Sequence, residues 1–211
     1  SSICLTENTE IRRVKRTVEH NSPFSNDMEK KNQILPVSLV TADEMRAYDT
    51  YTIQNIGIHT EVLMERAALA LADECMLLLK DARKKPREAK ALCVCGTGNN
   101  GGDGLACARL LADRGVEAKV LLVGNKEKLS EAAAYEYRIL QAYGVPVVSF
   151  GEDGFPAEEY SVIVDALFGT GLSRKITGDY KQVIETINDL PGKVVAADIP
   201  SGIDSDTGKI W

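Results

Sequence analysis

Histidine is scarce in this chain, cysteines are few and irregularly spaced, and long apolar runs are missing. The 211 residues include two histidines, His20 and His59, and five cysteines. We reject a zinc site, because the histidines lie in unrelated segments, and an odd cysteine count does not resemble a disulfide framework. We therefore expect a reducing, cytoplasmic compartment. No apolar run approaches the ~20 residues of a membrane span, so no membrane partner is expected.

An excess of basic residues is also absent. The chain has 31 acidic and 25 basic side chains, which gives a net charge of −6 at pH 7. Sequence-independent binding of DNA or RNA depends on a clustered basic surface, so we expect no nucleic-acid partner. A local pocket for a phosphorylated small molecule remains compatible with this charge.

The chain divides into two regions by composition. Residues 1–36 are polar and mixed in charge, and we expect a tail or extension, poorly ordered or with one short helix. Residues 37–211 are long enough for one domain with a sizeable core. Within it, Thr41 and Glu44 form a capping box ahead of a helix that should end near Gly57.

The rest of the domain alternates between strand and helix patterns. A second helix, capped by Thr60, is followed by nearly continuous apolar strands that are separated by helices. This alternation predicts an α/β fold with a mainly parallel sheet covered on both faces. Such a sheet usually continues after a final strand and its loop, so we expect the domain to be truncated at its C-terminus. The expected strands are 91–95, 118–123, 145–150, 161–165 and 193–198, and the expected helices are 102–114, 131–143 and 180–190.

The most informative segment is the glycine-rich stretch that follows the strand at 91–95. It reads Cys-Gly-Thr-Gly-Asn-Asn-Gly-Gly-Asp-Gly over residues 95–104 and leads into a helix. The free N–H groups at a helix start and the positive end of the helix dipole bind phosphate. The stretch fits the dinucleotide pattern G-x-G-x-x-G, but the next strand ends at Val123 without the acid that usually binds ribose. An ordinary NAD dehydrogenase is therefore disfavoured, and the Walker A pattern does not match.

Two further loops follow strands that end on an acid. Residues 165–172 read Asp-Ala-Leu-Phe-Gly-Thr-Gly-Leu, and residues 198–204 read Asp-Ile-Pro-Ser-Gly-Ile-Asp. Because ligands bind beyond the carboxyl ends of parallel strands, all three loops should meet at one edge of the sheet. A strand-end aspartate often only caps its own turn. Two such acids beside glycine-rich loops favour a functional site instead.

The polar side chains of these loops suggest a cation and a phosphate. Carboxylate, amide and hydroxyl oxygens of Asp165, Asn99, Asn100 and Ser201 together suit a hard cation, and a single carboxylate suits a monovalent ion. The alternative is that these side chains only hold their own loops. On the loop at 174–175, an arginine and a lysine either bind phosphate or remain solvated charges.

Through these three motifs the chain, over roughly residues 37–211, closely resembles the YjeF N-terminal domain family, the NAD(P)H-hydrate epimerases. The resemblance implies a Rossmann-like three-layer α/β/α sandwich. It implies an isomerase of nicotinamide nucleotide repair that interconverts the R and S epimers of NADHX and NADPHX, which are hydrated at C6 of the nicotinamide ring. An S-specific NAD(P)HX dehydratase, fused or separate, is the implied partner, and homodimers are common in the family.

The resemblance also implies roles for individual residues. One potassium ion per subunit would bind Asn100, Asp165 and Ser201. The implied catalytic residues are Asp198, Asp165 and Lys175. Substrate contacts would fall on Asn99, Asn100, Gly101, Gly102, Asp103, Gly169, Thr170, Gly171, Leu172, Ser173, Arg174, Lys175 and Asp198.

The chemistry at C6 requires a group that gives and takes protons near working pH. The ring nitrogen can expel the C6 hydroxyl if an acid assists, and water can return on either face; ring opening and reclosure is an alternative route. Asp198 is the first candidate for the proton carrier, while the cation would hold Asp165, and Lys175 would steady the phosphate or assist proton transfer. The alternative function is a non-catalytic nucleotide-binding or protein-interaction module of the same fold.

Overall fold

A six-stranded sheet forms the centre of the protein. The computed structural model describes residues 4–5, 40–172 and 174–211. The strand order in the sheet is β1-β6-β5-β2-β3-β4; β1 is antiparallel to β6, and the other five strands are parallel. Strand order therefore reverses between β2 and β5, which is where open α/β sheets bind ligands. The strands are β1 (Cys4–Leu5), β2 (Lys90–Cys95), β3 (Glu117–Leu122), β4 (Val147–Ser149), β5 (Val162–Ala166) and β6 (Lys193–Ala196).

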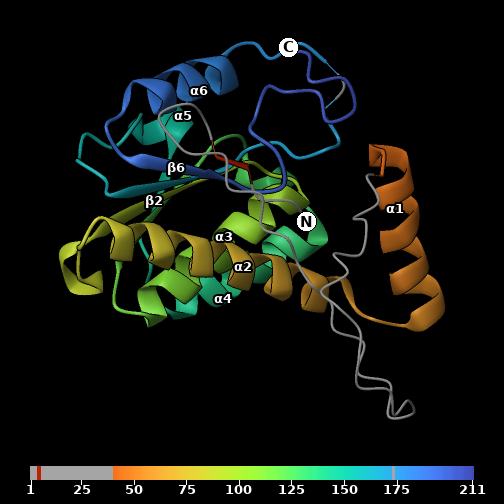
Figure 1. Cartoon of the computed structure of the whole chain (residues 1–211), viewed down its shortest axis with the longest axis horizontal. Helices are drawn as coiled ribbons and strands as arrows, with labels where there is room; N and C mark the ends of the chain where they lie inside the picture. The colour runs from red at the N-terminus through yellow and green to blue at the C-terminus, as the bar shows by residue number, and fades with distance from the viewer. Residues whose placement is uncertain (1–3, 6–39, 173) are drawn as a thin grey trace, which may run out of the picture.

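Helices cover both faces of this sheet, as Figure 1 shows. On one face lie α2 (Thr60–Asp81), α3 (Asn99–Asp113) and α4 (Glu131–Ala142), and on the other lie α5 (Phe150–Asp153) and α6 (Asp179–Asp189). Short 3₁₀ turns, η2 (Pro86–Glu88) and η3 (Lys126–Lys128), precede β2 and α4. The prediction of a Rossmann-like three-layer α/β/α sandwich is confirmed.

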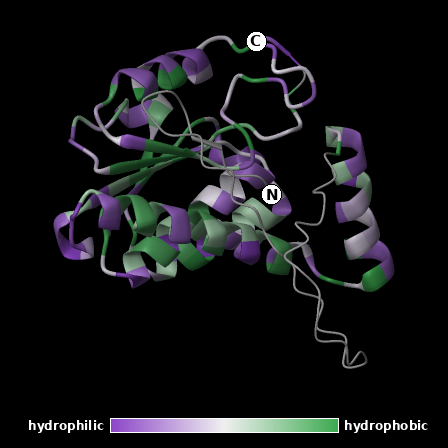
Figure 2. Cartoon of the chain, in the orientation of Figure 1, coloured by the Kyte–Doolittle hydropathy of each residue, from purple (hydrophilic) through white to green (hydrophobic). Residues whose placement is uncertain are grey.

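The strands supply two apolar cores by alternating their side chains. In β2, Cys93 and Cys95 belong to the core beneath α2, α3 and α4, whereas Leu92 and Val94 belong to the core beneath α6. This period-2 alternation explains why the strand is apolar along its whole length. Figure 2 shows the sheet as a hydrophobic layer between helices whose outer faces are hydrophilic.

Most predicted helices and strands are present, with boundaries shifted by one to three residues. Two helices, α2 and α3, begin with a different N-cap residue or at a different point of the motif than the sequence predicts. The glycine-rich motif is not a loop before α3: Gly98 is the N-cap, and the helix begins at Asn99. At the start of α2 the N-cap is His59 rather than Thr60, and its side chain makes no capping bond. Thr60 is helical because the preceding residue already has the extended backbone of a cap.

The capping box at Thr41 is present and begins α1 (Ala42–Tyr51). The Glu44 N–H donates to Thr41 Oγ1, and the Thr41 N–H donates to the Glu44 carboxylate at 2.8 Å. A π-helical turn, η1 (Thr52–Ile56), continues α1 and ends at Gly57, whose φ of 83° only glycine adopts readily. In Figure 1, α1 lies beside the three layers rather than within them.

The predicted short helix in residues 1–36 lies outside the described residues. Within that region, only Cys4–Leu5 is described, and it forms a strand that the sequence did not predict. None of the helices in the described part of the chain combines the length and the apolar character that a bilayer span requires.

Candidate functional site

Residues of all three loops line one cleft at the carboxyl ends of β2, β5 and β6, as the sequence predicts, and the third loop contributes Asp198 to it. The cleft has a volume of about 790 Å³, and α1 supplies its remaining wall. Its lining consists of Met45, Arg46, Asp49, Thr97, Gly98, Asn99, Asn100, Asp103, Leu167, Phe168, Gly169, Thr170, Gly171, Leu172, Arg174, Tyr180 and Asp198.

The first turn of α3 provides main-chain donors at this cleft. Gly102 N–H makes the first helical bond, to the Gly98 carbonyl at 3.1 Å, so helix geometry leaves the preceding N–H groups without helical acceptors. A Cβ on Gly101 would overlap the Gly96 carbonyl oxygen, so only glycine allows the strand and helix to approach this closely. The arrangement is an anion site formed by a helix N-terminus.

The two asparagines of this turn differ in how they are held. Ser130 Oγ donates to Asn99 Oδ1 at 2.6 Å, and the same hydroxyl accepts the Ala133 N–H and so caps α4. The Asn100 Nδ2 is buried and has no hydrogen-bond partner among the described residues. Asn99 is therefore partly a structural link to α4, whereas the Asn100 amide has a donor left for a ligand.

Asp198 is held in an uncommon backbone conformation at the meeting point of the loops. Its φ is 66°, in the left-handed region, and its Oδ2 accepts the Thr170 N–H at 2.7 Å. A Cβ on Gly169 would lie 2.7 Å from this Oδ2 and 3.3 Å from Asn100 Oδ1. Backbone strain of this kind is tolerated where the surroundings fix it, and it gathers at functional sites.

Asp103 lines the same cleft, one turn of α3 after the asparagines. Burial, followed by the negative charge of Asp198, raises the pKa of Asp103 to about 8; Glu136 and Asp49 act in the same direction. No described residue donates a hydrogen bond to its carboxyl group. This carboxyl group therefore tends to hold its proton at neutral pH.

Asp165 and Ser201 form a buried pair behind the cleft. Asp165 is 7% exposed, and its carboxylate accepts Ser201 Oγ–H at 2.6 Å, Ser201 N–H at 2.8 Å and Leu167 N–H at 3.3 Å. Burial raises the pKa of Asp165, and these donors oppose that rise. No described side chain of positive charge forms an ion pair with it.

The expected potassium ligands do not all face the same space. Asp165 and Ser201 line a second hollow of about 340 Å³, whereas Asn100 lines the cleft. One backbone segment separates them: the Phe168 N–H donates to Ser201 Oγ at 3.0 Å, and the adjoining Gly169 lies against the Asn100 amide.

The expected substrate contacts divide in the same way. Arg174 lines the cleft, but Lys175 lines the second hollow beside Asp165. Gly101 and Gly102 form the backbone of the α3 turn and are not themselves in the cleft lining, and Ser173 lies outside the described residues.

Four lining residues come from outside the three loops and were not predicted from the sequence. Met45, Arg46 and Asp49 come from α1, and Tyr180 comes from the start of α6. Tyr180 packs on Phe168 with ring centroids 4.8 Å apart and donates to the Val123 carbonyl at 3.2 Å. The capping box signals α1, but nothing in the sequence signals where α1 lies.

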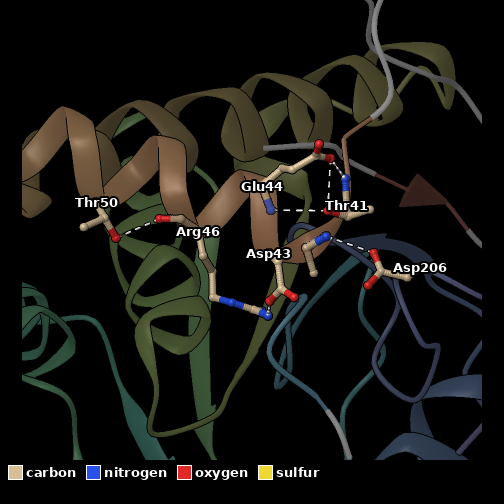
Figure 3. A network of polar contacts seen from close by, with 7 residues as sticks. Thr41, Asp43, Glu44, Arg46, Thr50 and Asp206 are labelled. Atoms are coloured by element: carbon tan, nitrogen blue, oxygen red, sulfur yellow. Dashed lines mark hydrogen bonds and ion pairs between the residues drawn. The ribbon is translucent and has the colours of Figure 1, made fainter.

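One long-range contact helps to place α1, as Figure 3 shows. The Ala42 N–H, in the first turn of α1, donates to Asp206 Oδ1 at 2.9 Å. In the same view, Arg46 pairs with Asp43 on the helix surface. A side chain near the end of the chain thus positions the helix that lines the cleft.

Fold and site together define a doubly wound α/β protein with a helix-start anion site and strand-end acids in one cleft. Within that class, the chain belongs to the family described as YjeF-related protein N-terminus, whose profile matches residues 60–211.

Relatives support this membership along most of the chain. A protein of Oenococcus oeni named NAD(P)H-hydrate epimerase is 42% identical over 171 residues, covering 81% of this chain and 78% of its own. A protein of the same name from Limosilactobacillus reuteri is 44% identical over 172 residues, covering 82% and 77%. The crystal structure of yeast ynu0 aligns with a TM-score of 0.73 at 28% identity, covering 83% of this chain and 75% of the yeast chain.

Proposed function

We propose that this chain is an NAD(P)H-hydrate epimerase, an isomerase that interconverts the R and S epimers of NADHX and NADPHX. The relatives with this name span most of the chain and support the activity. The observation that carries the proposal is the convergence of three loops on one cleft, where the α3 start faces Asp198. A dinucleotide needs an anion site for its pyrophosphate, and the C6 centre needs a proton carrier beside it.

Roles follow from position in the cleft. The pyrophosphate would bind the N–H groups at the start of α3, with Asn99, Asn100 and Arg174 around it. Asp198 would exchange protons at C6, because its carboxylate is fixed by Thr170 at the meeting point of the loops. Lys175 would act from the second hollow, by steadying the loop that carries Arg174.

A potassium ion fits the donor set around Asp165. A buried carboxylate without a described cationic partner, beside a hydroxyl and the Phe168 carbonyl, favours a bound monovalent cation. Asn100 would complete the set from the cleft side of the Phe168–Gly169 segment. When bound, such an ion supplies positive charge that keeps Asp165 ionised and the loops in place.

The chemistry of the product indicates its partner. An epimerase that equilibrates two hydrates is useful beside an S-specific dehydratase, so we place this chain with an NAD(P)HX dehydratase, fused or separate, in the cytoplasm. We also propose a homodimer, as the resemblance to this family implies.

A coupled assay tests the function. Purified R-NADHX is mixed with an S-specific dehydratase, and recovery of NADH is followed by its absorbance. Addition of this chain should accelerate recovery well beyond spontaneous epimerisation. Tight binding of the hydrate without acceleration would contradict the epimerase and support a non-catalytic nucleotide-binding module.

A further inference from the structure

We propose that Asp103 is a second catalytic residue, the acid that protonates the departing C6 hydroxyl while Asp198 acts as the base. This inference rests on the proposed function and extends it, because the cleft then holds two carboxyl groups with opposite tasks. Asp103 comes from α3, and Asp198 comes from the loop after β6, so the two reach the cleft from different layers of the fold.

The donors around the two carboxyl groups differ. Asp198 accepts the Thr170 N–H at 2.7 Å, which fixes the position of its carboxylate. Asp103 accepts no hydrogen bond from the described residues, although it lies in the first turns of α3. One cleft therefore holds a carboxyl group fixed by a main-chain donor and another without such a donor, and carboxyl groups in different surroundings can divide the tasks of acid and base.

The charges that face Asp103 also favour its neutral form. Acids act on it from three other elements: Asp49 on α1, Glu136 on α4, and Asp198 after β6. From β2, Cys95 is a buried thiol whose own pKa is raised, chiefly by burial. Two arginines, Arg46 and Arg174, also line the cleft, and neither forms an ion pair with Asp103 among the described residues.

The balanced reaction takes one proton from Asp103 and gives one proton to Asp198. The ring nitrogen forms a double bond to C6 as the C6–O bond breaks, and the Asp103 proton passes to the leaving oxygen, which departs as water. Water then adds to the other face of C6, its proton passes to the Asp198 carboxylate, and the electron pair returns to nitrogen. No oxidant or reductant is consumed. The opposite epimer uses the two residues in reverse, and proton transfer between them through the cleft resets the pair.

The test compares Asp103→Asn with the unmodified chain in the coupled assay, from pH 6 to pH 9.5. The unmodified kcat should decline on the alkaline side as Asp103 loses its proton, near the pKa of about 8. Asp103→Asn should lower kcat by about 10²–10⁴-fold while binding of the hydrate is retained. Asp113→Asn, an aspartate at the far end of the same helix, should leave kcat and the pH profile unchanged.

A second readout does not depend on turnover. The carboxyl carbons of aspartate are labelled with ¹³C, and the Asp103 signal is assigned as the one missing in Asp103→Asn. If that signal titrates on the alkaline side of pH 7, the result supports Asp103 as the catalytic acid. If it titrates near pH 4, the result overturns that role. Equal kcat in Asp103→Asn and the unmodified chain also overturns the acid role of Asp103, while the proposed epimerase function stands. An unmodified chain without any turnover overturns both the proposed function and the acid role of Asp103.

Discussion

The backbone N–H of Thr170 donates a 2.7 Å hydrogen bond to Oδ2 of Asp198, and so joins the loop after β5 to the loop after β6. Asp198 adopts a left-handed φ of 66° in this position, which is a strained conformation for a residue with a side chain. The bond fixes the carboxylate at the edge of the cleft. A carboxylate fixed beside an anion site is the arrangement that a proton exchange at a bound nicotinamide requires.

Replacement of Asp198 by Asn should separate binding from turnover. The amide keeps the size of the side chain and an oxygen for the Thr170 N–H, and asparagine tolerates a positive φ. It cannot take a proton, so kcat should fall by about 10²–10⁴-fold. Isothermal titration should give an affinity for the hydrate close to that of the unmodified chain. Normal turnover by this variant would remove Asp198 from its role.

A methyl group at Gly169 should disturb the same bond without removing any functional group. Its Cβ would lie 2.7 Å from Asp198 Oδ2, so the carboxylate must shift. A displacement of about 1 Å at a reacting group costs on the order of 10²-fold in rate. The measurement is kcat/KM in the coupled assay.

Gly151→Ala is the matched control for this substitution. Gly151 lies in α5, is exposed, and a Cβ added there would meet nothing within 4 Å. The kcat/KM of this variant should equal that of the unmodified chain. Equal losses in both variants would show that the effect does not arise at Asp198.

Removal of the Asp206 carboxylate should loosen α1. Asp206→Ala leaves the Ala42 N–H without its acceptor, which costs about 0.5–2 kcal/mol of helix stability. Hydrogen exchange across residues 42–51 should accelerate, and KM should rise more than kcat falls, because α1 lines the cleft. Asp206→Asn keeps an oxygen that can accept the Ala42 N–H, so its exchange rate and KM should lie between those of Asp206→Ala and those of the unmodified chain. Unchanged exchange in Asp206→Ala would mean that other contacts hold α1.

Asp103 should also make the protein less stable as pH rises. Its folded pKa, about 8, lies above the ordinary value of 3.8, so between these values the folded state binds the extra proton. Stability then falls with rising pH through this window. Asp103→Asn removes this pH-dependent loss of stability. Its melting temperature should therefore exceed that of the unmodified chain above pH 8, and the difference should vanish near pH 4. A difference that grows toward low pH would contradict the sign.

Ser201→Ala should weaken both the fold and its response to potassium. The variant removes the hydroxyl that donates to Asp165 at 2.6 Å, which costs about 1–3 kcal/mol for a buried charged acceptor. Potassium chloride should raise the melting temperature of the unmodified chain above its value in choline chloride at equal ionic strength. This difference should shrink in Ser201→Ala. Identical melting in both salts for the unmodified chain would argue against a potassium site.

Much of the fold can be predicted from the sequence, and there are physical reasons why the rest cannot. The apolar strand at Ala91–Cys95 and the alternation around it predict the parallel sheet, because both faces of each strand are buried. The glycines at 96–104 predict an anion site, but not that the helix begins inside the motif at Asn99. The backbone of Gly101 lies so close to the Gly96 carbonyl that a Cβ there would overlap it, and this packing of the turn is not visible in the residue pattern.

Placement of the site residues was predictable only in part. Convergence of Asp198 with the glycine motif follows from parallel topology. The wall formed by α1 does not, since a contact that helps to place this helix joins Ala42 to Asp206, 164 residues away along the chain. Likewise, the assignment of Lys175 to the second hollow and Arg174 to the cleft depends on which way successive side chains of one loop point.

A crystal structure of this chain with bound NADPH hydrate tests the central claim most directly. We predict that the pyrophosphate binds the N–H groups that begin α3, and that C6 of the nicotinamide ring lies beside the Asp198 carboxylate. A hydrate bound in the second hollow beside Lys175, or a nicotinamide ring turned away from Asp198, would contradict it.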